Sequence, residues 1–106
     1  MLNRYNTTKS NRYYLQDKNR TALALAIEVA LMKRGGDRYY NFVFKLRNSY
    51  NCEIIECYDK PQYLKNVLKE VYGNEYDSII EDIKLELGDS IEEGIIAFLA
   101  MLEKNT

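Results

Sequence analysis

The chain has 106 residues, of which 46% are hydrophobic and 29% are charged, and its formal net charge is −1. These values are typical of one soluble globular domain and exclude a wholly disordered chain. This small net charge is the sum of a basic N-terminal half and an acidic C-terminal half. Residues 1–51 hold ten Lys and Arg against three acidic residues (+7), whereas residues 52–106 hold five against thirteen (−8). This asymmetry predicts a charged partner for one half, or contact between copies of the chain.

The sequence predicts no membrane as a partner, because its apolar segments are short. The longest of them, residues 22–32, is too short to span a bilayer and contains Glu28. The N-terminus has no apolar segment that ends in a small-residue cleavage site, which is the pattern of a secretory signal. We therefore expect a cytoplasmic protein.

Residues 1–20 are predicted to form a basic N-terminal arm. They are rich in Asn, Thr, Ser, Lys and Arg, and their apolar residues follow no steady period. Terminal segments of this kind are commonly poorly ordered until a contact holds them. Residues 21–106 are predicted to form a single helical-bundle domain.

The first predicted helix begins at Asp17 or Asn19 and ends before the two glycines at 35–36. Its apolar residues follow a 3.6-residue spacing and extend around most of the helix. Such a helix is typical of the middle of a bundle. The apolar residues are Ala22, Leu23, Leu25, Ala26, Ile27, Val29, Ala30, Leu31 and Met32.

Four further helices are predicted from capping residues, helix-ending glycines and apolar periodicity. The predicted starts are Asp37, Asp59 with Gln62 and Pro61, Asn74, and either Asp89 with Glu92 or Ser90 with Glu93; Gly73 and Gly88 are predicted stops. Their apolar faces are Tyr39, Val43, Leu46 and Tyr50, with Tyr40 and Phe44 beside them; Tyr63, Leu64, Val67, Leu68 and Val71; Tyr76, Ile79, Ile80, Ile83 and Leu87; and Ile91, Ile95, Phe98, Leu99 and Leu102. The fold class is therefore predicted to be all-α, a compact bundle of about five helices.

Residues 50–58 are predicted to be a loop with one helical turn, in which Ile54 and Ile55 close an end of the core; a lone strand there would lack a pairing partner. Cys52 and Cys57 also lie in this stretch. On a continuous helix they would point about 140° apart. The chain has no histidine to complete a zinc site. Two small half-buried thiols at the start of a helix are the favoured interpretation, with a zinc site shared across a dimer and a disulfide as alternatives, and no cofactor or metal is assigned.

The order of several motifs resembles a small archaeal helical domain family, NitrOD5, the Nitrososphaera output domain group. The motifs are the Ala-rich helix, the glycines at 35–36, Tyr40, Tyr50-Asn51-Cys52, Cys57-Tyr58-Asp59-Lys60-Pro61 with Tyr63-Leu64, and Tyr72-Gly73 with Tyr76. The resemblance covers roughly residues 21–103 and is most specific at Cys-Tyr-x-x-Pro-x-Tyr-Leu. It implies an all-helical signalling or regulatory output module and brings no catalytic residues.

The residue types argue against an enzyme. There is no histidine, which is the usual general base near neutral pH. The five glycines form no phosphate-binding loop, and no serine has an evident base partner. We therefore predict no catalytic residues and no small-molecule substrate.

Two binding functions remain, and both use the basic half. The first is self-association as a homo-oligomer, or docking to a protein partner, oriented by the opposite charges of the two halves. The alternative is nucleic-acid binding, in which cations contact phosphates and aromatic rings stack on bases. The candidate contact residues for either function are Arg4, Tyr5, Lys9, Arg12, Tyr13, Tyr14, Lys18 and Arg20 in the arm, with Arg38 and Lys45 on the second helix.

Overall fold

The computed structural model describes the backbone of residues 3–89 and 92–104, and the side chains of residues 17–89 and 92–104. Within these ranges the chain is all-α and has no strand, as the sequence predicts. Its elements are α1 (Asn3–Met32), α2 (Gly36–Tyr50), the 3-10 helix η1 (Ile54–Asp59), α3 (Pro61–Tyr72), the 3-10 helix η2 (Gly73–Glu75), α4 (Tyr76–Leu87) and α5 (Glu93–Glu103). The predicted cap Ser90 and the predicted apolar residue Ile91 lie outside the described residues.

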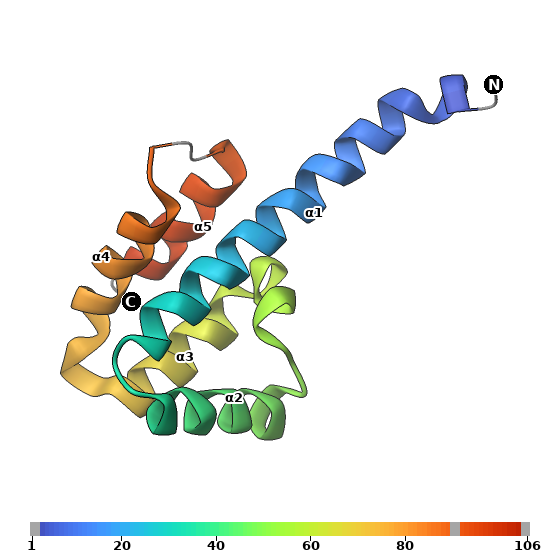
Figure 1. The fold of residues 1–106 in the computed structure, drawn as a ribbon. Coiled ribbons are helices and arrows are strands. Elements are labelled where there is room, and N and C mark those ends of the chain that lie inside the picture. The colour runs from blue at the N-terminus through green and yellow to red at the C-terminus, as the bar shows by residue number, and fades with distance from the viewer. Residues whose placement is uncertain (1–2, 90–91, 105–106) are drawn as a thin grey trace.

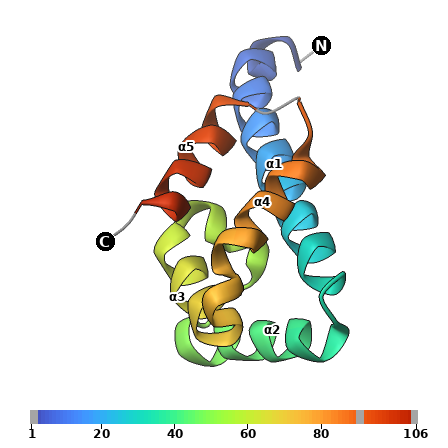
Figure 2. The same cartoon turned by 90° about the vertical axis from the view of Figure 1, so that its left-hand side faces the viewer.

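Helix α1 is the long axis of the molecule. In Figures 1 and 2 its N-terminal turns reach beyond the other helices, while its C-terminal half lies among them and α2 crosses beneath. A helix of 30 residues is about 45 Å long, whereas the two shorter dimensions of the molecule are 30 and 27 Å. The radius of gyration is 15.1 Å, compared with about 13 Å for a compact chain of this length.

The helix also begins earlier than the apolar pattern predicts, at Asn3 and not near Asp17. Residues 3–34 contain neither Pro nor Gly, and adding a residue to a formed helix costs far less than starting one. A helix that is held by packing at residues 23–31 therefore continues through a polar segment. Because the side chains of residues 1–16 are outside the described part, their role as an arm stays a prediction.

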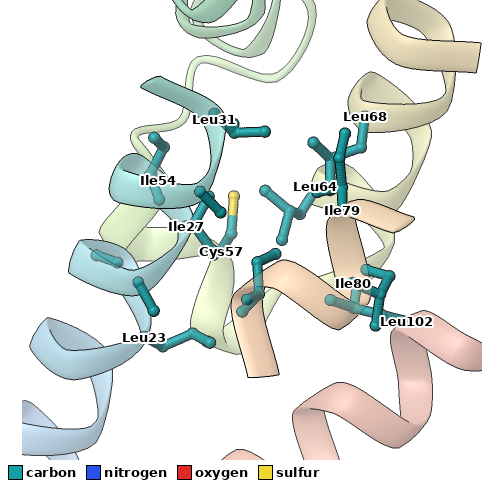
Figure 3. Close-up of a cluster of buried hydrophobic side chains, with 14 of the residues drawn as sticks. Leu23, Ile27, Leu31, Ile54, Cys57, Leu64, Leu68, Ile79, Ile80 and Leu102 are labelled. Carbon is teal, nitrogen blue, oxygen red and sulfur yellow. The ribbon is translucent and has the colours of Figure 1, made fainter. Parts of the chain in front are cut away.

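The core lies between the C-terminal half of α1 and the helices that follow it. Figure 3 shows side chains from α1, η1, α3, α4 and α5 converging there, with the sulfur of Cys57 among them. Three leucines or isoleucines of α1 enter at successive turns, as their 3.6-residue spacing requires. The central residues are Leu23, Ile27, Leu31, Cys57, Leu64, Leu68, Ile79, Ile83 and Leu102, each no more than 2% exposed.

The predicted helix ends are confirmed more often than the predicted caps. Pro61 opens α3, and Gly73 and Gly88 end α3 and α4 with positive φ angles of 58° and 73°. The predicted side-chain caps Asp37, Asp59, Asn74 and Asp89 are wrong: no side-chain capping bond is found at the starts of α2, α3, α4 and α5. Asp59 pairs with Arg20 instead, and Asn74 lies within η2. The capping box forms at η1.

Candidate interaction surface on helix α1

One apolar face of α1 is left uncovered by the bundle. Leu25 is 58% exposed and Met32 48%, Ala22 is exposed, and Val29 is half-buried. Helix α1 contacts α2, η1, α4 and α5, as predicted for a helix in the middle of the bundle. These elements cover the side of Leu23 and Ile27 and leave the side of Leu25 and Met32 exposed. We call Ala22, Leu25, Val29 and Met32 the α1 stripe.

The residues of the α1 stripe are spaced by three, four and three positions. Alternating steps of three and four residues place side chains along one line of a helix and are the spacing of a coiled-coil seam. In the sequence the same spacing continues backwards to Lys18 and Leu15. The stripe is therefore patterned for contact with a second helix.

Hollows flank the stripe on both sides. Between α1, α2 and η1 lies a hollow of about 520 Å³, whose walls include Leu25, Val43 and Ile55. Between α1 and α4 lies a smaller one of about 240 Å³, whose walls include Leu25 and Val29. Leu25 thus stands as a ridge between two grooves, which is the relief that helix-on-helix packing uses.

Seven cations of the basic half have side chains that the structure describes, and six of these form ion pairs within the fold. Five of their acidic partners lie on η1, α3, η2 or α4, with the sixth just before η1. Opposite charges of the two halves therefore attract each other inside one chain, which accounts for much of the division seen in the sequence. The pairs are Arg20–Asp59, Lys33–Glu86, Arg34–Glu75 and Arg34–Asp82, Arg38–Glu75, Lys45–Glu70 and Arg47–Glu53, with nitrogen–oxygen distances of 2.5–3.0 Å.

The most connected of these groups is Glu75 in η2. Its Oε1 accepts a hydrogen bond from Nη1 of Arg34 at 2.8 Å, and its Oε2 accepts one from Nη1 of Arg38 at 2.5 Å. Arg38 also lies over the ring of Tyr72, 4.8 Å from its centre. The hydrogen bond from Arg38, and then the one from Arg34, hold the pKa of Glu75 below its ordinary value of 4.5. The cluster joins α1 and α2 to the start of α4.

This cluster predicts an acid-dependent loss of stability. Because the pKa of Glu75 is lower in the folded chain than in the unfolded one, its contribution is complete above about pH 4.5 and is lost as the pH falls through the folded pKa. In urea unfolding measured from pH 6 to pH 3, Glu75→Gln should lose less stability than the natural chain. Asp37→Asn, at an exposed residue with no ion pair found within the described residues, should follow the natural curve. Parallel curves for all three chains would contradict this prediction.

The predicted contact residues fall into two groups. Arg20, Arg38 and Lys45 form ion pairs with Asp59, Glu75 and Glu70. These three cations therefore already have acidic partners within their own chain. Lys18 is exposed, and no ion pair of it is found among residues 17–89 and 92–104. Six residues lie in the N-terminal half of α1, where side chains are outside the described part: Arg4, Tyr5, Lys9, Arg12, Tyr13 and Tyr14.

Sequence reasoning missed the α1 stripe because it assigned these residues to the core. A signal was present. The apolar residues of this segment extend around most of the helix, whereas a helix packed on one side needs an apolar sector of only about 100°. The excess, at Leu25 and Met32, lies on the exposed side.

The side chains of residues 17–89 and 92–104 can be searched for a metal site. Among them, no three or more Asp, Glu or Cys side chains are grouped so that they could hold a metal ion, and the chain has no histidine. No helix in the described part is both long and apolar enough to cross a membrane.

Comparisons of the chain with protein-family models, with curated proteins and with solved structures found no match. The resemblance to NitrOD5 therefore stays a prediction.

Proposed function

We propose that this chain is a non-enzymatic interaction module of the cytoplasm that self-associates, two copies packing antiparallel along the α1 stripe. The observation that carries the proposal is the exposure of Leu25 and Met32 within a seam of coiled-coil spacing. Contact with the same face of a second copy would remove this apolar surface from water, and an isologous contact of this kind is the commonest oligomeric arrangement.

Spacing and charge favour the antiparallel arrangement. In a parallel pair, Lys18 would lie opposite Lys18 of the partner subunit. The basic N-terminal half of α1 would also lie beside the same half of the other copy, so like charges would repel. In the antiparallel register that we propose, Ala22 lies opposite Leu25 of the partner subunit, and Lys18 lies opposite Val29 of the partner subunit. Val29 lines the groove that also contains Glu86 of α4.

Helix α4 supplies the complementary charge. It carries four acidic residues against one lysine, and it packs beside α1, with Glu86 and Leu87 lining the same groove as Val29. The N-terminal half of α1 carries Arg4, Lys9 and Arg12 and, through residue 16, no acidic residue. Antiparallel packing would set Lys18, just beyond this basic segment, near the groove of the other copy that contains Glu86, an attraction that orients the pair and speeds its formation.

The test is the solution mass by light scattering of the natural chain and of Leu25→Glu. The natural chain should have twice the mass of one 12.5 kDa chain. Leu25→Glu should be monomeric, because pairing would bury a carboxylate without a partner; we expect the dissociation constant to rise by at least about 100-fold. Since Leu25 is exposed within one chain, far-ultraviolet circular dichroism should show the same helical fold.

Phe44→Glu is the matched control. Phe44 on α2 is 61% exposed, nearly as much as Leu25, but it lies outside the α1 stripe. The control should remain dimeric. A monomeric natural chain, or equal masses for both variants, would reject self-association through this face.

Orientation can be measured separately with a spin label at Met32→Cys. In the antiparallel register, residue 32 lies opposite residue 15 of the other chain, so the two labels would be displaced by about 25 Å along the helices. Labels in direct contact would show a parallel pair and overturn the antiparallel arrangement.

Nucleic-acid binding remains the alternative. Because Arg20, Arg38 and Lys45 are held in ion pairs, the contacts would come from Arg4, Lys9, Arg12 and Lys18, with Tyr5, Tyr13 and Tyr14 as stacking groups. Replacing these four cations with Ala should then abolish a salt-sensitive affinity for duplex DNA without lowering the solution mass. Absence of any salt-sensitive affinity in the natural chain would dismiss this alternative.

A further inference from the structure

Cys52 and Cys57 lie side by side inside the fold. Their Sγ atoms are 3.7 Å apart, and the two residues are 6% and 0% exposed. Both thiols also approach the carbonyl oxygen of Glu53, at 3.4 and 3.6 Å. In Figure 3 the sulfur of Cys57 points into the core, toward the side chains of α1 and α3.

The backbone explains this contact. The prediction that the two cysteines point about 140° apart assumed one continuous helix, and this stretch is not one. Residue 53 is extended, with φ −100° and ψ 161°, and η1 begins only at Ile54. The capping box between Glu53 and Glu56, in which the Glu53 N–H donates to Oε1 of Glu56 at 2.8 Å, fixes the change of direction. The chain therefore folds back and brings Cys57 against Cys52.

We propose that Cys52 and Cys57 are a disulfide-forming site, which closes a loop around residues 53–56 when the protein meets a small-molecule disulfide. A disulfide bond is about 2.05 Å long, so the two sulfurs need to approach by less than about 2 Å from their present 3.7 Å. Both are already shielded from other protein molecules, which favours a bond within one chain over a bond between chains.

The reaction proceeds by two thiol–disulfide exchanges. Cys52 loses its proton, its sulfur attacks one sulfur of the oxidant, and the first small thiolate leaves and takes up a proton. Cys57 then loses its proton and attacks Cys52 Sγ, and the second small thiolate leaves and is protonated. Two protein thiols become one disulfide, and one small-molecule disulfide becomes two thiols.

The surroundings assign the order of attack. Cys57 is fully buried, and burial raises the pKa of its thiol, so it is the poorer first nucleophile. Cys52 precedes η1 in non-helical backbone, where local opening breaks few hydrogen bonds. Cys52 is therefore the attacking thiol and Cys57 the resolving one.

The disulfide would stiffen the segment that lines one side of the hollow between α1, α2 and η1. Ile54 and Ile55, which lie between the two cysteines, line the hollow between α1, α2 and η1. Closing the loop removes conformational freedom from the unfolded chain and holds the first residues of η1 against the segment that precedes them. The proposal does not depend on self-association, because its readout is the chemical state of two residues in one chain.

The experiment treats the full chain with mixtures of oxidised and reduced glutathione. Each sample is then denatured in acid and alkylated, and the mass of the intact chain is measured by mass spectrometry. The natural chain should lose two hydrogens, take up no alkyl group and no glutathione, remain a single chain without reductant, and unfold at a higher temperature than the reduced form. Persistent glutathione adducts, chains joined to one another, or two alkylated thiols at every ratio would each overturn the proposal.

The single variants test the order of attack. Cys57→Ser should retain one glutathione, because the attacking thiol has no resolving partner. Cys52→Ser should retain far less, because its remaining thiol is enclosed. Equal adduct formation by the two variants would overturn the assigned order, while the mass of the natural chain decides the disulfide itself without relying on either variant.

Discussion

Phe42→Ala should lower the free energy of unfolding by about 3–5 kcal/mol, which is a large share of the stability of a chain of this size. Phe42 is fully buried, and its ring lies 6.5 Å from that of Tyr72, centre to centre, so it joins α2 to α3. Truncation leaves a cavity between two helices that surrounding side chains refill only in part. Urea unfolding followed by circular dichroism measures the change.

Phe44→Ala is the control on the same helix. It removes the same atoms two residues further on, where the side chain is 61% exposed, and should change stability by less than about 0.5 kcal/mol. Equal effects of the two substitutions would show that α2 is rotated from its position here. The pair is informative because the sequence pattern names Phe44 beside the apolar face and omits Phe42.

Gly94→Ala should destabilise the fold by about 1–2 kcal/mol, although Ala is the better helix former. Gly94 lies in the first turn of α5, and a methyl group there would overlap the hydroxyl oxygen of Tyr58 and lie 3.4 Å from the side-chain amide of Asn19. Tyr58 cannot move without cost, because it stacks on Phe98 and lies beneath Arg20. The overlap should therefore exceed the gain in helix propensity.

In a chain that also carries Tyr58→Phe, Gly94→Ala should stabilise the fold instead of destabilising it. Removing the hydroxyl leaves the nearest ring carbon 3.5 Å from the added methyl group, an ordinary contact. Relative to Tyr58→Phe alone, the double variant should then be more stable by up to about 1 kcal/mol, the usual advantage of Ala over Gly in a helix. Unfolding of all four chains forms a double-mutant cycle. Additive effects would contradict the contact between Gly94 and Tyr58.

The sequence by itself determines the helices and most of their ends. Pro61, Gly73 and Gly88 act through their own backbone restrictions, and the 3.6-residue spacing of apolar residues acts within one helix. All of this information is local, so the all-α class can be predicted without knowing how the helices meet. Side-chain caps are harder to predict from the sequence, because a side chain such as Asp59 can pair with a residue far away in the chain. Asp59 pairs with Arg20.

Only the tertiary structure decides which apolar residues the bundle covers. Leu25 and Leu23 have the same side chain two positions apart on α1, yet one is 58% and the other 2% exposed. Their difference depends on where α4 and η1 pack, which is a long-range property. The same holds for the ion pairs of Arg34 and Arg38, whose partner Glu75 is about forty residues away in the sequence.

The cysteine pair shows the same limit at short range. Cys52 and Cys57 are five positions apart, but their contact requires an extended residue followed by a 3-10 turn, and the core on the other side holds that turn in place. The sequence therefore determined what this chain is built from, because helix formation is local. The tertiary structure decided which residues it presents for contact and which it brings together, because burial and pairing depend on residues distant in the chain.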